Sequence, residues 1–296
     1  MKFCCYFLML LSVVSCSSSK ELDARWARDK NIAAKLEGKV VVYTIFVDSK
    51  KTIPWSGFDI KSTKDSLDKV FNWVGRESKR YKKEVRIESI YATLSSKQTI
   101  NKKIPYSSLS AAFSDGEYSK SSKIGKWADG IVKKLEKGIK ISGEPLPKKP
   151  KLDAFQKLVE KLKRNHQADN VVIFFMLNNY YKYDLSVVVN NMHSTEVEFG
   201  VNSSKSTNLL GAQFLSLFGA QNLNTGSSSS KEKEVVQMLK EDFSHDVMYD
   251  YESDLVNVNV GEHTAYLIGW KDKVNSKYAE LFKLKPGKKK KSEKHN

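Results

Sequence analysis

Two apolar runs separated by an amphipathic segment constrain the fold more than any other feature of the sequence. Residues 40–49 (VVVYTIFVDS) are rich in β-branched side chains, the pattern of a strand buried on both faces. Residues 62–83 carry apolar side chains at helical spacing, with Ser62 and Thr63 as the expected capping residues. Residues 84–94 then alternate between apolar and polar side chains. This order predicts a crossover unit with two parallel strands.

Three further strands are expected in the second half of the chain, at residues 169–178, 184–191 and 195–202. The links between them are short, which favours antiparallel or edge strands. We therefore expect an α/β (α+β) fold with a mixed, mostly parallel twisted sheet, an antiparallel edge strand and packed helices. The strand expected at the edge is TEVEFGVN, with these alternating residues along it: Thr195, Val197, Phe199 and Val201.

The remaining pattern divides the chain into segments. Helices are expected at residues 21–36, 122–137, 153–164, 207–220, 231–241 and 264–270, and irregular chain at 243–255. Residues 95–150 are rich in Ser and Lys and are interpreted as an insertion over the sheet. The expected organisation is a leader at 1–15, a tether at 16–24, one domain at 25–275 and a disordered basic tail at 276–296.

The N-terminal segment has the pattern of an export signal. MKFCCYFLMLLSVVSC contains one Lys, an apolar run too short to span a bilayer, and small residues before Cys16. Its last four residues resemble the bacterial lipobox, which implies cleavage before Cys16 and lipidation of that residue. An ordinary cleaved signal peptide is the alternative. The resemblance predicts a lipid-anchored protein of the cell envelope, in the outer membrane, with the leaflet left open.

The charge of the chain argues against specific recognition of nucleic acid. The net charge is +16, but only six of the 50 basic residues are arginines. The guanidinium group, which can form bidentate hydrogen bonds, is therefore scarce. Lysine favours loose attraction to anionic surfaces over base readout, and the simplest alternative is that lysine serves solubility. All three cysteines lie within the first 16 residues, which excludes a disulfide framework and a thiolate metal site in the rest of the chain.

Three segments have the order and spacing of a protease signature but lack its metal-binding and catalytic residues. LLGAQFLSLFGAQNL (209–223), FSHDVM (243–248) and TAYLIGW (264–270) follow one another at plausible spacing. In order and spacing they resemble the metal-binding helix, the Met-containing turn and the closing segment of bacterial metzincin zinc proteases. That family carries His-Glu-x-x-His, a glycine and a third ligand, with a methionine below the metal.

The resemblance places the metal-ligand positions and the general-base position on residues that cannot perform these functions. Aligned on Gly219, the first and second ligand histidines fall on Ala212 and Ser216, and the third falls on Asn222. The general base falls on Gln213, whose amide does not titrate, while Met248 is retained in the turn. The resemblance therefore implies a metzincin-like fold without catalytic zinc, catalytic residues or another cofactor. The alternative is a plain core helix that ends at Gly219.

These observations lead to an expected function and to its rivals. We expect a non-catalytic pseudoprotease that binds an extended peptide, a protein partner or an anionic envelope or host polymer, besides its membrane anchor. One alternative is an enzyme with a rearranged metal site built from His193, His245 or Asp246, although no two histidines of the chain are spaced for one helix face. The other alternative is a purely structural surface lipoprotein.

Overall fold

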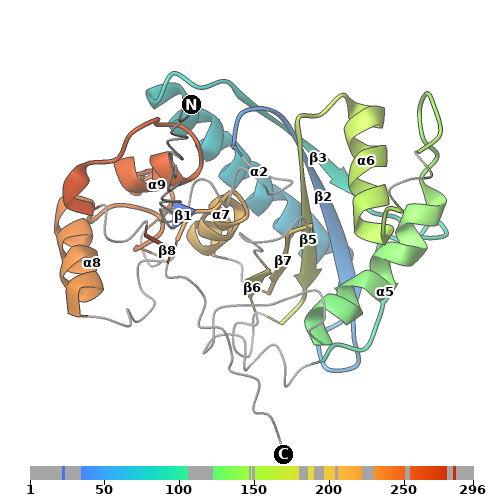
Figure 1. The fold of residues 1–296 in the computed structure, drawn as a ribbon. Coiled ribbons are helices and arrows are strands. Elements are labelled where there is room, and N and C mark those ends of the chain that lie inside the picture. Colours follow the sequence, from blue (N-terminus) through green and yellow to red (C-terminus); the bar gives the residue numbers. More distant parts are fainter. Residues whose placement is uncertain are drawn as a thin grey trace, which may run out of the picture.

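The structure is a computed structural model with one six-stranded sheet between two layers of helices (Figure 1). It describes residues 22–23, 35–105, 123–146, 148, 151–179, 186–189, 197–203, 206–221, 230–250, 254–278 and 283–284. Six helices and the sheet account for most of these residues, which confirms the expected mixed α/β class. In the described part of the chain, no helix is both long and apolar enough to cross a bilayer.

The sheet is mostly parallel and has an antiparallel strand at one edge. Its order is β3 (Val85–Tyr91), β2 (Gly38–Asp48), β5 (Asn170–Leu177), β7 (Phe199–Asn202) and β6 (Val187–Val189), while β4 (Thr99–Asn101) extends the β3 side of β2. The strands β3, β5 and β7 join their neighbours in parallel, and only β6 runs antiparallel, against β7. The β-branched run of β2 therefore lies inside the sheet, between β3 and β5, and is buried on both faces.

One face of the sheet carries the larger core. The side chains of Val40, Val42 and Phe46 on β2 point towards helices α2 (Gly57–Arg80) and α7 (Thr207–Ser216). These helices contact each other through Phe71 and Phe214, whose ring centroids are 5.6 Å apart. Beyond α7, helices α8 (Ser230–Asp242) and α9 (Glu262–Leu267) extend this layer (Figure 1). The expected helices at 207–220, 231–241 and 264–270 are confirmed, with α7 and α9 ending earlier than predicted.

The opposite face is covered by α5 (Lys123–Gly138) and α6 (Ala154–His166), as Figure 1 shows. The alternate β2 residues Val41, Tyr43 and Ile45 belong to this second core. Helix α5 lies inside the segment interpreted as an insertion, and its buried side chains show that it is part of the domain core.

The start of the first long helix differs from the sequence prediction. Helix α2 begins at Gly57 with Ser56 as its N-cap, whereas Ser62 and Thr63 were expected to cap it. The Ser56 hydroxyl accepts from the Asp59 backbone N–H at 3.1 Å, and Asp59 reaches back to Ser56, which forms a capping box. Thr63 is instead buried inside the helix. The capping box at Ser56 forms in place of the predicted cap because it satisfies two backbone donors at the end of the helix.

The predicted edge strand is wrong, because β7 lies inside the sheet and β6 forms the edge. Strand β7 pairs with β5 on one side and with β6 on the other. Val197, Phe199 and Val201 are buried in the second core rather than presented at a cleft, and Thr195 is outside the described residues. Gly200 permits this position, since a Cβ atom there would lie 2.5 Å from the Phe174 ring.

The two ends of the described chain also differ from expectation. Leu22–Asp23 (β1) pairs antiparallel with Lys283–Leu284 (β8), and residues 35–36 are not helical, so the predicted helix at 21–36 is wrong at both ends. Leu22 and Asp23 lie in the expected tether, and Lys283 and Leu284 lie in the expected tail. Tyr278, inside the predicted tail, is buried against the first core, and its hydroxyl bonds to Asp242.

Candidate functional site

The face of α7 that corresponds to the protease signature lies in the core between α2 and a turn near the C-terminus. Gly211 is the contact point: a Cβ atom there would lie 3.6 Å from Trp73, 3.6 Å from Leu255 and 3.8 Å from Val247. Ala212 is 2% exposed and belongs to the same core as Met248. Helix α7 therefore packs at Gly211 against Val247, the residue before Met248, in the first core.

The position of the general base is occupied by a neutral amide pair. Gln213 is 5% exposed, and its Oε1 atom accepts a hydrogen bond from the Nδ2 atom of Asn202, at the end of β7. Asn202 is fully buried, and its Oδ1 atom has no partner. The side chain that should face a metal-bound water in the family instead joins α7 to the sheet.

The ligand position Ser216 also makes a contact within its own helix. Its hydroxyl donates to the Ala212 carbonyl at 2.9 Å, which joins the two ligand positions along the helix. The chain then turns at Gly219, whose φ of +96° lies in the region that favours glycine. The Ala220 N–H reaches back to the Leu215 carbonyl at 3.2 Å, as expected for a glycine at a helix end. Asn222 is outside the described residues.

The Met-containing turn is held by a buried carboxylate. The Oδ1 atom of Asp246 accepts from the Met248 backbone N–H at 2.7 Å, and its Oδ2 atom accepts from the Gly261 N–H at 2.6 Å. The Thr264 hydroxyl also bonds to this carboxylate. Gly261 must be a glycine, since a Cβ atom there would lie 2.5 Å from Oδ2 of Asp246. Residue 246 thus anchors the turn to the segment before α9.

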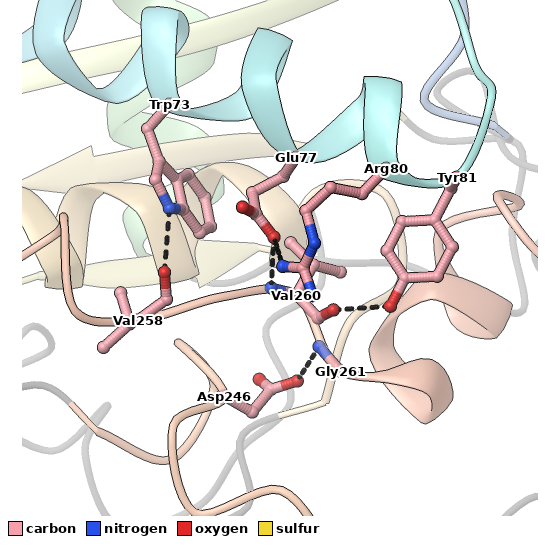
Figure 2. Close-up of polar contacts among 8 residues, drawn as sticks. All are labelled: Trp73, Glu77, Arg80, Tyr81, Asp246, Val258, Val260 and Gly261. Atoms are coloured by element: carbon pink, nitrogen blue, oxygen red, sulfur yellow. Dashed lines mark hydrogen bonds and ion pairs between the residues drawn. The ribbon is translucent and has the colours of Figure 1, made fainter.

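That segment is fastened to α2 by side chains spaced along one helix face (Figure 2). Trp73 donates to the Val258 carbonyl at 3.2 Å, and Tyr81, just after the helix, donates to the Val260 carbonyl at 2.6 Å. Glu77 accepts from the Val260 N–H at 3.0 Å and pairs with Arg80. The turn under α7 therefore has a fixed position relative to α2.

Two titratable groups are buried beside each other at this anchor. Burial raises the pKa of Asp246 to about 6, against the effect of its hydrogen-bond donors, and burial lowers the pKa of His263 to about 4. The Thr264 hydroxyl lies 3.1 Å from Nε2 of His263. Since its single proton goes to Asp246, Nε2 donates to the hydroxyl oxygen, and Nδ1 is left as a buried atom without a partner.

The candidates for a rearranged metal site do not converge in the described residues. His245 is exposed, while Asp246 is fully buried and turned towards backbone donors. His193 is outside the described residues, as is the lipidation candidate Cys16. Across the ranges that the structure describes, there is no group of three or more His, Cys, Asp or Glu side chains that could hold a metal ion.

Sequence reasoning missed the residues that position this site. Asn202 and Gly261 gave no signal on their own, because an asparagine after a strand and a glycine before a helix are common. Trp73, Glu77 and Tyr81 could have been noticed as polar-tipped residues on one face of a long helix. Their partners, however, lie about 180 residues away, for example 183 residues between Glu77 and Val260.

None of the family models, curated proteins and solved structures with which the chain was compared matches it.

Proposed function

We propose that this protein is a non-catalytic, lipid-anchored protein of the bacterial cell envelope with a metzincin-like domain, and that it binds an extended peptide along its edge strand. The observation that carries the proposal is the buried Gln213–Asn202 amide pair at the position of the general base. A neutral amide whose oxygen is engaged by another amide has no basic atom for activating water.

The order of elements supports the family part of the proposal. A parallel crossover unit, the strand β5, an antiparallel edge strand and a helix beneath the sheet occur in the order that the resemblance predicted, with the inner strand β7 between the edge strand and the helix. The Met-containing turn then lies in the same core as that helix. A plain core helix would not require a buried methionine turn at this spacing.

The peptide-binding part of the proposal moves from β7 to β6. In active relatives the substrate adds to the edge strand above the helix, and here that edge is β6. Val188, in the middle of β6, faces the core that contains α7, and its side chain is only partly buried. A peptide beside β6 would therefore contact the sheet and the α7 layer together.

Metal analysis separates this proposal from the enzyme alternative. The purified mature chain, dialysed against an equivalent of zinc, is expected to retain less than stoichiometric metal and to leave a fluorogenic peptide library uncleaved. Elemental analysis provides the measurement, with His245→Ala as a comparison. Stoichiometric zinc that is lost in His245→Ala, or peptide cleavage that a chelator stops, would establish the enzyme instead.

Restoring the missing ligands tests the resemblance itself. The variant Ala212→His, Ser216→His, Asn222→His should gain one tight cobalt or zinc site, because two histidines four residues apart share one helix face. Cobalt absorption in the visible range reports tetrahedral binding. A matched variant with Thr207→His in place of Ala212→His puts the first ligand on the opposite side of α7 and should not gain the site. Equal binding by both variants, in folded protein, contradicts the metzincin-like frame.

The anchor is tested separately at Cys16. Replacing Cys16 by alanine should abolish incorporation of labelled palmitate and move the protein from the membrane fraction to the soluble fraction, because only lipid holds the mature chain. Cys5→Ala, within the expected leader, is the control and should be lipidated normally. Retention of Cys16→Ala in the membrane fraction would show that another segment anchors the protein.

A further inference from the structure

The edge of the sheet opposite β6 carries a basic groove. It lies between the C-terminal half of α2 and the first half of β3, has a volume of about 850 Å³, and is closed at one end by the turn that joins them. This volume is in the range of ligand-binding clefts. Phe71, Val85 and Ile87 supply apolar side chains, and the lining also contains these five cationic residues: Arg76, Lys79, Lys82, Lys83 and Arg86.

Three of the cations have no ion-pair partner among the residues that the structure describes. Lys83 lies 3.6 Å from Glu37, and Arg86 lies 3.2 Å from Glu84. For Arg76, Lys79 and Lys82, the described residues offer no acidic group within ion-pair distance, and all three are exposed. The groove also contains two of the six arginines of a lysine-rich chain, and arginine is the cation suited to bidentate recognition of carboxylates.

The strand that forms one wall has a free backbone edge. The Gly38 N–H donates to the Glu84 carbonyl at 2.9 Å, and the Ala92 N–H donates to the Thr44 carbonyl at 2.8 Å, so the even-numbered residues point towards β2. In a parallel ladder the alternate residues point the other way. Val85, Ile87, Ser89 and Tyr91 therefore aim their N–H and C=O groups outward, where no described strand pairs with β3. Such an edge is a template for another extended chain.

The helix that forms the other wall contains a glycine that the fold does not need. A Cβ atom at Gly75 would meet no atom within 4 Å, and glycine inside a helix costs about 1 kcal/mol relative to alanine. Gly75 lines the groove at the level of Arg76. Glycine at such a place lets a ligand approach the helix backbone closely.

Cationic residues line the groove at the Val85 end of β3, whereas two aspartates lie near Tyr91 at its other end, outside the groove. The unpaired cations lie beside Val85 and Ile87, whereas Asp68 and Asp65 lie close enough to Tyr91 to contribute, after burial, to its raised pKa. Lys64 covers the Tyr91 ring at 4.2 Å. A bound chain would therefore place its negative charges at the Val85 end.

We propose that this groove binds an acidic extended peptide, which adds to the free edge of β3 as a further strand while its carboxylates contact Arg76 and Lys79. Backbone hydrogen bonds along β3 provide the affinity that is independent of sequence, and the cations select acidic side chains. This site lies across the sheet from β6 and does not depend on the proposed function.

Binding of a defined peptide measures the proposal directly. The probe is a short fluorescein-labelled peptide in which valine or threonine alternates with glutamate, and anisotropy reports its affinity. A peptide with N-methyl groups at alternate residues cannot pair with β3 and should bind at least about tenfold more weakly. Lysine in place of glutamate should reduce binding further, and affinity for the acidic peptide should fall with added salt.

Variants of the groove locate the site. Arg76→Gln with Lys79→Gln should weaken the acidic peptide about tenfold, whereas Lys126→Gln with Lys134→Gln removes the same charge from exposed positions of α5 and should change little. Gly75→Trp should block the groove, while Gly75→Ala, which adds only one carbon atom, should weaken binding less than Gly75→Trp and should be more stable than the wild type. Thermal unfolding confirms that every variant is folded.

The competing explanations give different outcomes. Equal binding of the N-methylated peptide, or equal effects of the two paired variants, would show general attraction to polyanions and overturn the proposal. Binding to phosphatidylglycerol vesicles without binding to the acidic peptide would assign the groove to a lipid surface instead. Absence of binding to the peptide in the wild-type protein also overturns it. Each outcome leaves the proposal for β6 and α7 standing.

Discussion

Replacing Asp246 by alanine is expected to lower the free energy of unfolding by about 3 kcal/mol or more, the largest effect of any single change considered. The substitution leaves the N–H groups of Met248 and Gly261 and the hydroxyl of Thr264 without their acceptor in a site that excludes water. Each buried donor left without a partner costs about 1–3 kcal/mol. The turn under α7 would then lose its link to the segment before α9.

The effect of Asp246→Ala is measured by urea unfolding at neutral pH, followed by circular dichroism. Asp254→Ala is the control, since Asp254 is an exposed acid in the same region, and it should change the free energy of unfolding by less than about 0.5 kcal/mol. Asp246→Asn should also be destabilising, because its NH₂ group must face one of the backbone donors. Equal stability of Asp246→Ala and Asp254→Ala would show that the anchor does not hold the turn.

His263 is expected to make the protein sensitive to acid. Its pKa is about 4 in the folded protein because burial disfavours the charged ring, whereas an unfolded histidine titrates near 6.5. Between these two pKa values, the unfolded chain therefore binds a proton at His263 that the folded chain does not bind. The stability contributed by neutral His263 is present above pH 6.5 and falls by about 3 kcal/mol as the pH drops to 4.

Asp246 acts in the opposite direction over nearly the same range. Its folded pKa of about 6 lies above the unfolded value, so its contribution is full below about pH 4 and is lost as the pH rises through 6. The wild-type protein should therefore show a shallow pH profile. Asp246→Asn should show a steeper loss of stability between pH 7 and 4, because the histidine term is no longer opposed.

Comparison with a non-titrating variant isolates the histidine. The difference in unfolding free energy between His263→Leu and the wild type should shift by about 3 kcal/mol in favour of the variant between pH 7 and 4. The effect of Asp246 is common to both and cancels to first order. A curve for His263→Leu that is parallel to the wild type would mean that folding does not shift the pKa of this histidine.

The local pattern predicted most elements of the fold because each depends on neighbours in the sequence. The β-branched run of β2 and the apolar spacing of α6 and α7 report burial directly. Asp153 was not identified as a cap, yet α6 began within a residue of the prediction. The beginning of α2 was predicted wrongly because Ser62 and Thr63 are typical N-cap residues. The actual N-cap is Ser56, which forms a capping box with Asp59.

The pairing of strands and the contents of the candidate site depended on contacts between distant residues. The short links around β6 suggested an antiparallel edge strand, but they could not decide which strand takes the edge. That choice depended on the buried positions of Phe199 and Val201 and on the space that Gly200 leaves for Phe174. The sequence also showed that Gln213 is not a base, but not that Asn202 binds it.

The sequence by itself determined the class of the fold, the central strands, the two helical faces and the uncharged side chains of Ala212, Gln213 and Ser216 on α7, because these follow from side-chain type and periodicity. Only the tertiary structure decided that β6 is the edge, that Asp246 ties Met248 to Gly261, and that α2 and β3 enclose a basic groove. The physical reason is that hydrogen bonds and charges act over a few ångströms in space. Their partners here stand from two to more than one hundred and eighty residues apart along the chain, as Asp246 with Met248 and Glu77 with Val260 show.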